Sequence, residues 1–189
     1  MTRPFTILGI SGSLRRESYN RSLLLASRDL LPEDVVIDIF DLEGIPLFNQ
    51  DTEQQPVARV TEFKEKIREA DAILIATPEY NYSVPGVLKN AIDSASRPYG
   101  DSAWGGKPVA LMGASPGAFG SARAQYHLRQ ILVTLDMPTV NQPEVMISHA
   151  DKAFDAQGKL LDANCAKLIR KLVGNLVHLS RQLKASNDD

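Results

Sequence analysis

Short apolar runs alternate along the chain with longer segments in which apolar residues recur every three or four positions. The short runs predict buried strands, and the longer spacing predicts amphipathic helices. The predicted strands are residues 5–10, 35–40, 72–77, 109–113 and 145–148. The predicted helices are residues 22–31, 56–67, 85–92, 122–135 and 160–183. Strands and helices therefore alternate throughout the chain.

This alternation predicts an α/β fold built on a doubly wound, five-stranded parallel sheet with helices on both faces. Each return to a parallel neighbour needs a right-handed crossover, which the intervening helix supplies. Residues 72–77 are apolar without a polar face, as expected of a central strand covered on both sides. In the flavodoxin-like strand order 2-1-3-4-5, the loops after the first, third and fourth strands converge at the carboxyl edge of the sheet.

The length, charge and composition of the 189-residue chain exclude several classes of protein. No internal repeat or linker divides it, so we expect a single domain over residues 1–189. The net charge of −2 supplies no basic stripe for nucleic acid, and no apolar stretch reaches the length of a membrane span. The first residues lack a signal-peptide core, and Cys165 is the only cysteine, which together predict a cytoplasmic protein without internal disulfides.

The first converging loop, residues 12–20, concentrates hydroxyl, amide and guanidinium groups where a helix begins. The free N–H groups of a helix start attract an anion, most simply a phosphate. The loop lacks the three glycines of the dinucleotide fingerprint and the GxxxxGK[ST] pattern, so a monophosphate held by side chains fits better. The alternative is that Ser18 and Asn20 only cap the helix, while Arg15 is solvated.

The second loop, residues 77–86, places two tyrosines and several amide or carboxylate groups at a strand end held by prolines. A flat heteroaromatic ring needs such a rigid edge, with aromatic contacts and fixed hydrogen-bond donors. The alternative is a polar loop whose tyrosines cover the core.

The third loop, residues 113–120, is rich in glycine, which lets the backbone approach a ligand and donate N–H groups to a ring carbonyl or an anionic ring nitrogen. The histidines at 127, 149 and 178 show no metal-binding spacing, so we expect no metal site.

Together the three loops resemble the NADPH-dependent FMN reductase family, which includes bacterial quinone, chromate and azo-dye reductases. The resemblance covers nearly the whole chain. It rests on the Gly-Ser-Leu-Arg stretch 12–15 with Ser18 and Asn20, on residues 78–93 and on residues 123–129. Ser94 departs from the family pattern, because relatives often have tryptophan there, and Ser121 interrupts what is often a pair of glycines.

The resemblance implies that the first loop holds the FMN phosphate and that the second and third loops border the isoalloxazine ring. The expected cofactor-binding residues are Ser13, Arg15, Ser18, Tyr19, Asn20, Pro78, Glu79, Tyr80, Asn81, Tyr82, Ser115 and Gly117. It also implies a homodimer or homotetramer, with subunit contacts from residues 82–97 and 123–129.

The implied activity is a ping-pong reaction in which NADPH or NADH gives a hydride to N5 of the flavin and departs. A small oxidised acceptor, such as a quinone, an azo compound, chromate or free flavin, then takes the electrons. No catalytic residue of the protein is required, because the flavin carries the chemistry. One alternative is a flavodoxin-type electron carrier, although a net charge of −2 does not supply the usual acidic docking surface. The other is a flavin-binding regulatory module.

Overall fold

All five predicted strands pair into one parallel sheet in the computed structural model, which describes residues 3–186. The strand order is β2-β1-β3-β4-β5, as predicted. β3 is central, and each of its five residues is buried. The strands span Phe5–Ser11 (β1), Val35–Phe40 (β2), Ala72–Ala76 (β3), Val109–Ala114 (β4) and Val145–Ile147 (β5).

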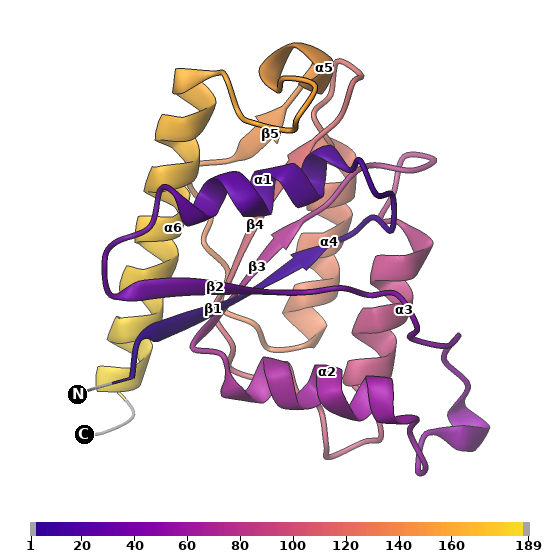
Figure 1. Cartoon of the computed structure of the whole chain (residues 1–189). Coiled ribbons are helices and arrows are strands. Elements are labelled where there is room, and N and C mark those ends of the chain that lie inside the picture. The colour runs from indigo at the N-terminus through magenta and orange to yellow at the C-terminus, as the bar shows by residue number, and fades with distance from the viewer. Residues whose placement is uncertain (1–2, 187–189) are drawn as a thin grey trace.

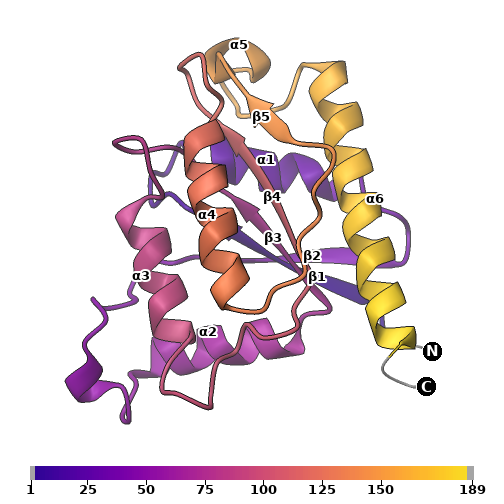
Figure 2. The same cartoon turned by 180° about the vertical axis from the view of Figure 1, so that it is seen from behind.

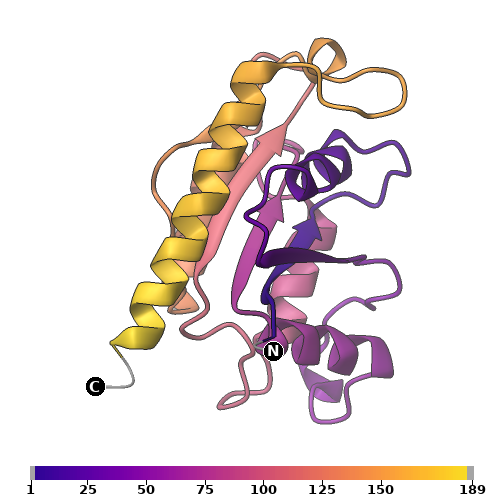
Figure 3. The same ribbon diagram turned by 60° about the vertical axis from the view of Figure 1, so that its left-hand side comes forward.

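The helices cover both faces of the sheet, and each face has its own apolar core. The α-helices are Tyr19–Arg28 (α1), Ala58–Glu69 (α2), Gly86–Ala95 (α3), Ala122–Thr134 (α4), Ala150–Ala153 (α5) and Ala163–Ala185 (α6), and Gln50–Thr52 forms a short 3-10 helix, η1. One core joins the sheet to α1, α5 and α6, and the other joins it to α2, α3 and α4. Figure 1 shows α1 in front of the sheet, and Figure 2 shows α3 and α4 in front of the opposite face. α6 runs beside β4 (Figure 3).

Two helices begin three residues away from their predicted starts, because polar side chains cap them. α1 begins at Tyr19, three residues early, because the Ser18 hydroxyl accepts a hydrogen bond from the Arg21 N–H at 3.4 Å. α6 begins only at Ala163, because the Asp162 carboxylate accepts from the N–H groups of Asn164 at 2.8 Å and Cys165 at 3.0 Å. Leu161, which lies inside the predicted helix, therefore precedes α6, and Leu168 is 41% exposed. The helix buries instead Ile169, Leu172, Val173, Leu176, Val177 and Ser180.

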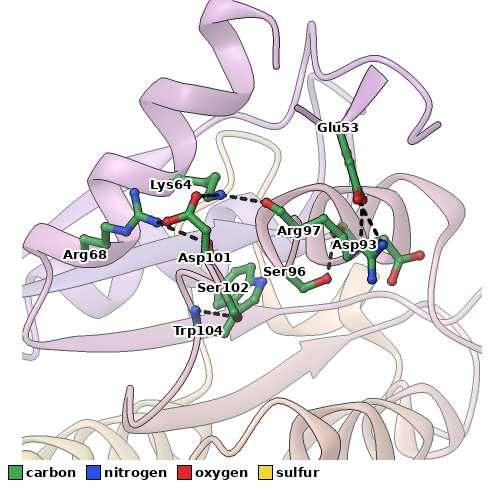
Figure 4. Close-up of polar contacts among 9 residues, drawn as sticks. All are labelled: Glu53, Lys64, Arg68, Asp93, Ser96, Arg97, Asp101, Ser102 and Trp104. Carbon is green, nitrogen blue, oxygen red and sulfur yellow. Dashed lines mark hydrogen bonds and ion pairs between the residues drawn. The ribbon is translucent and has the colours of Figure 1, made fainter. Parts of the chain in front are cut away.

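The connection from α3 to β4 has no regular structure, but ion pairs and hydrogen bonds fix its course (Figure 4). Arg97 donates to both carboxylate oxygens of Glu53, at 2.7 and 3.1 Å. The buried Lys64 ammonium donates to the Arg97 carbonyl at 2.6 Å and to Asp101 at 2.5 Å. The indole of Trp104 donates to the Ile92 carbonyl at 3.0 Å. This end of the molecule, opposite the carboxyl edge, is therefore rigidly held.

No helix within residues 3–186 combines the length and the apolar character that crossing a membrane would require.

Candidate active site

The loops after β1 and β3 pack directly against each other at the carboxyl edge. The Gly12 N–H donates to the Ala76 carbonyl at 2.8 Å. A Cβ atom at Gly12 would lie 3.1 Å from side-chain atoms of Thr77 and Leu88. Contacts that tight leave little space for a side chain, so glycine at position 12 allows the two loops to meet.

The first loop presents its charged side chains to solvent. Residues 14–17, which include Arg15, are exposed, and Ser13 is half-buried. The Ser13 hydroxyl accepts from the Arg15 N–H at 3.3 Å, and the buried Ser18 hydroxyl caps α1. Ser13, Arg15 and Ser18 therefore lie around the N-terminus of α1, where the helix dipole and free N–H groups favour an anion.

Tyr19 and Asn20 belong to the first turn of α1 rather than to the loop. The buried Asn20 amide donates to the Ala114 carbonyl at 3.0 Å and accepts from the Ala114 N–H at 2.9 Å. The Tyr19 ring stacks on Phe154, with ring centres 5.7 Å apart. Both side chains thus have partners in the fold, and contact of either residue with the cofactor stays a prediction.

The second loop forms a tight hairpin at the end of β3. Tyr80 and Ser83 exchange two backbone hydrogen bonds of 3.1 and 3.0 Å. The two residues between them, Asn81 and Tyr82, have φ angles of 50° and 67°, in the left-handed region that few side chains adopt. The hairpin exposes the rings of Tyr80 and Tyr82, so it presents aromatic faces to any ligand at this edge.

Glu79 ties this hairpin to the start of α4. One of its carboxylate oxygens accepts from the N–H groups of Arg123 at 2.9 Å and Ala124 at 3.3 Å, and the other accepts from the Arg123 guanidinium. Burial alone would raise the pKa of Glu79, but the hydrogen bonds from Arg123 and Ala124 lower it below its ordinary value. The carboxylate therefore caps α4, whose N-cap residue Ser121 makes no side-chain capping bond.

Arg123 joins the second and third loops, a role that its sequence position did not reveal. Its guanidinium lies 3.6 Å from the ring centre of Tyr82 and 4.3 Å from that of Phe119. These cation–π contacts hold the rings of Tyr82 and Phe119 against the same guanidinium. A second link joins the Ser83 hydroxyl to His127 Nδ1 at 3.0 Å. Although residues 123–129 belong to a family motif, nothing in the pattern showed that they contact a loop 44 residues earlier.

The third loop is hydrogen-bonded to the end of β5 and to the start of α5. The Ser115 N–H donates to the Ile147 carbonyl at 3.0 Å, and the Ser115 carbonyl accepts from the Ala150 N–H at 3.1 Å. The Ser115 hydroxyl accepts from the Gly117 N–H at 3.2 Å. Gly117 is exposed, so backbone groups of this loop are accessible beside the hairpin.

The described contacts bring the expected residues to one edge of the sheet, around two distinct surfaces. One is the N-terminus of α1 with its serines and Arg15, and the other is the rigid aromatic hairpin with the third loop beside it. On a 2-1-3-4-5 parallel sheet, this arrangement defines a flavodoxin-like nucleotide-binding protein. The family model of NADPH-dependent FMN reductases matches residues 5–152. The chain belongs to this family.

Relatives with assigned functions are similar over most of the chain. An NAD(P)H-dependent FMN reductase of Pseudomonas aeruginosa is 52% identical over 97% of this chain and 100% of its own. A 2-hydroxy-1,4-benzoquinone reductase of a Burkholderia species is 47% identical over 85% of this chain and 88% of its own. The solved structure of FerB, a flavoenzyme NAD(P)H:(acceptor) oxidoreductase from Paracoccus denitrificans, has a TM-score of 0.86 at 35% identity and covers 94% of this chain and 97% of its own. The predicted family, enzyme class and cofactor pair, FMN with NAD(P)H, are confirmed.

Proposed function

We propose that this enzyme uses FMN, held across the three loops, to pass electrons from NADPH or NADH to quinones by a ping-pong mechanism. The observation that carries the proposal is the meeting of an anion-binding helix start with a rigid aromatic hairpin at one edge of the sheet. A phosphate and a flat ring joined by a short chain need these two surfaces side by side.

The phosphate side of the site fits the monophosphate of FMN. Ser13 and Ser18 hydroxyls lie at the start of α1, and the exposed Arg15 supplies a positive charge. Hydrogen bonds between a guanidinium and a phosphate are among the strong ones in proteins. Riboflavin lacks the phosphate, so this surface would distinguish it from FMN.

The ring side fits a flat heteroaromatic group. The Tyr80–Ser83 hairpin is fixed by its own backbone bonds and by Glu79 and Ser83 contacts to α4. Pro78 is buried at the base of this hairpin. The third loop offers the Ser115 hydroxyl and the exposed backbone around Gly117 beside it.

When bound, FMN supplies the hydride and electron transfer chemistry, and the chain binds and orients the ring. The carboxylate at this edge, Glu79, is paired with Arg123 and has a lowered pKa, so it stays ionised at neutral pH. It therefore positions the hairpin rather than donating a proton. This agrees with a reaction that needs no acid or base from the protein.

Quinones are proposed as acceptors because the relative from Burkholderia is a benzoquinone reductase and is 47% identical. Steady-state rates measured at several fixed quinone concentrations while NADPH is varied test the mechanism. Parallel double-reciprocal lines are expected, since the donor leaves before the acceptor binds. Intersecting lines would show that both substrates bind together and would contradict the ping-pong order.

We also propose that the enzyme is a homodimer or homotetramer in the cytoplasm. Large apolar or aromatic side chains are exposed on and around α3 and α4, including Tyr82 at 68%, Tyr126 at 49% and Val133 at 80%. Exposed apolar groups that gather on one side of a protein favour association. Sedimentation velocity at micromolar concentration should give the mass of two or four chains, and a 20.7 kDa species would contradict the proposal.

A further inference from the structure

The amino edge of the sheet, opposite the three loops, contains a polar hollow. Its volume is about 340 Å³, and it lies where the chain enters β1, β3 and β4 and where α6 ends. Figure 3 shows the start of β1 and the end of α6 at the same end of the molecule. None of the residues that the flavin site uses lines this hollow.

Two cations pair with the buried carboxylate of Asp71 in this hollow, and a third cation, Lys107, lies beside them. The Asp71 side chain is only 5% exposed, and one of its oxygens accepts from Arg3 at 2.7 Å and from Lys184. Its other oxygen accepts from the Thr6 N–H at 2.8 Å. The Lys107 ammonium donates to the carbonyls of Arg68 and Ala70, at 2.6 and 2.7 Å, and is half-buried.

The positive charges lie close enough to influence one another. Burial lowers the pKa of Lys107, Asp71 raises it, and the charges of Lys184 and Arg3 lower it further. Asp71 alone does not balance the positive charges of Arg3, Lys107 and Lys184.

The excess of positive charge extends to Arg68, which also lines the hollow. Arg68 donates to Asp101 at 2.5 Å, but Lys64 shares the same carboxylate (Figure 4). Among the lining residues, the four cations Arg3, Arg68, Lys107 and Lys184 face the two carboxylates Glu69 and Asp71, an excess of two positive charges. The whole chain carries a net charge of −2, so the hollow has the opposite sign to the protein.

We propose that this hollow binds a small multivalent oxyanion of the phosphate class. Lysine has three donors and arginine five, which is more than the described carboxylate and carbonyl partners of these side chains use. A phosphate group would accept several of these bonds and would neutralise the excess charge. The source is either free inorganic phosphate or pyrophosphate, or the phosphate of a nucleotide.

A substitution at Gly105 can change the charge of the hollow without removing a hydrogen-bond partner of Asp71. Gly105 lines the hollow. A Cβ atom at this position would have no atom of a residue beyond its two chain neighbours within 4 Å, and the φ angle of Gly105 lies outside the left-handed region. Aspartate or asparagine at this position therefore fits the backbone equally well. Gly105→Asp adds a negative charge, and Gly105→Asn is the neutral control of nearly the same shape.

The test uses FMN-loaded, ¹⁵N-labelled enzyme, so that the flavin phosphate site is already filled. Pyrophosphate is titrated while the backbone amide signals at positions 105 and 106 are followed, and the flavin spectrum confirms that FMN is retained. We expect saturable shifts that weaken about tenfold or more in Gly105→Asp and less than threefold in Gly105→Asn. Lys107→Met should weaken binding similarly, whereas Lys171→Met, an exposed charge change on α6, should not.

Adenosine 5′-monophosphate in a parallel titration identifies the source. Tighter binding than pyrophosphate at the same two amides would assign a nucleotide phosphate, and weaker binding would assign a free oxyanion. Shifts that never saturate with either anion would overturn the proposal. Equal weakening by Gly105→Asp and Gly105→Asn would also overturn it, because the effect would then be steric rather than electrostatic.

Discussion

The loop after β1 exposes four consecutive residues, 14–17, and the side-chain bonds described within it are as long as 3.3 and 3.4 Å. The loop after β3 instead forms a hydrogen-bonded hairpin with strained residues and is fixed to α4 by Glu79 and Ser83. The proposed ring side of the site is therefore held in place by bonds within the chain, while the proposed phosphate side has room to adjust. Substitutions in the second loop should therefore lower the free energy of unfolding, and substitutions in the first loop should weaken the binding of FMN.

The largest expected effect is in the first turn of α1, behind the first loop, where Asn20→Ala should lower the unfolding free energy of the apoprotein by about 3 kcal/mol. Two buried backbone groups of Ala114 lose their partner in this variant. Urea unfolding measures the change, and Ser18→Ala, which removes only a helix cap, should cost about 1 kcal/mol. An Asn20→Ala protein of normal stability that has lost only FMN affinity would assign the amide to the phosphate instead.

In the second loop, Glu79→Ala should lower the unfolding free energy by about 2 to 3 kcal/mol. The change removes a nearly buried carboxylate that caps α4 and pairs with the partly exposed Arg123. Glu79→Gln is the control, because its amide oxygen still accepts from the helix N–H groups, and its loss should be smaller. A loss of FMN affinity without any loss of stability would contradict the idea of a preformed hairpin.

The same carboxylate gives a pH dependence. Its pKa in the folded protein lies below the ordinary value of 4.5, so its stabilisation is complete above about pH 4.5 and is lost as the pH falls through the folded value. The stability difference between the wild type and Glu79→Gln should therefore shrink below pH 4.5. A difference that stays constant from pH 7 to pH 3 would show that the charge of Glu79 does not stabilise the fold.

In the first loop, Arg15→Ala should weaken FMN binding about thirtyfold, or ~2 kcal/mol, and leave riboflavin binding and stability nearly unchanged. The guanidinium is exposed and has no described partner that folding would need. The neighbouring exposed Arg16, changed to alanine, controls for the loss of general positive charge. Equal loss of FMN and riboflavin affinity would show that Arg15 supports the loop rather than the phosphate.

The smallest effect concerns Ser121, whose φ of 70° lies in the left-handed region. Ser121→Gly relieves this backbone strain but removes the hydroxyl that accepts from Gln125 at 3.1 Å, so stability should change by less than about 1 kcal/mol. Ser121→Ala keeps the strain and loses the bond, so it should be the less stable of the two. Thermal unfolding of the pair gives the order, and the reverse order would contradict this account.

The sheet order and the three converging loops were predictable, because strand and helix periodicities and the right-handed crossover rule leave few topologies. The partners of individual side chains were not. Ser18 could cap a helix or hold a phosphate, and Asn20 contacts a strand 94 residues later. The Glu79–Arg123 pair spans 44 residues, and such tertiary contacts leave no local pattern. The sequence therefore predicted which loops meet at the carboxyl edge, while the contacts of their side chains depend on the fold.

The central claim is that the chain is a flavin-dependent NAD(P)H oxidoreductase whose site is built by these three loops. Its most direct test is to load the purified protein with FMN without oxygen, remove free flavin, and record the visible spectrum before and after NADPH or NADH is added. We expect about one FMN per chain, bleached by either donor and restored by a quinone. Bound FMN that stays oxidised would contradict the claim and favour an electron carrier or a regulatory flavin-binding module.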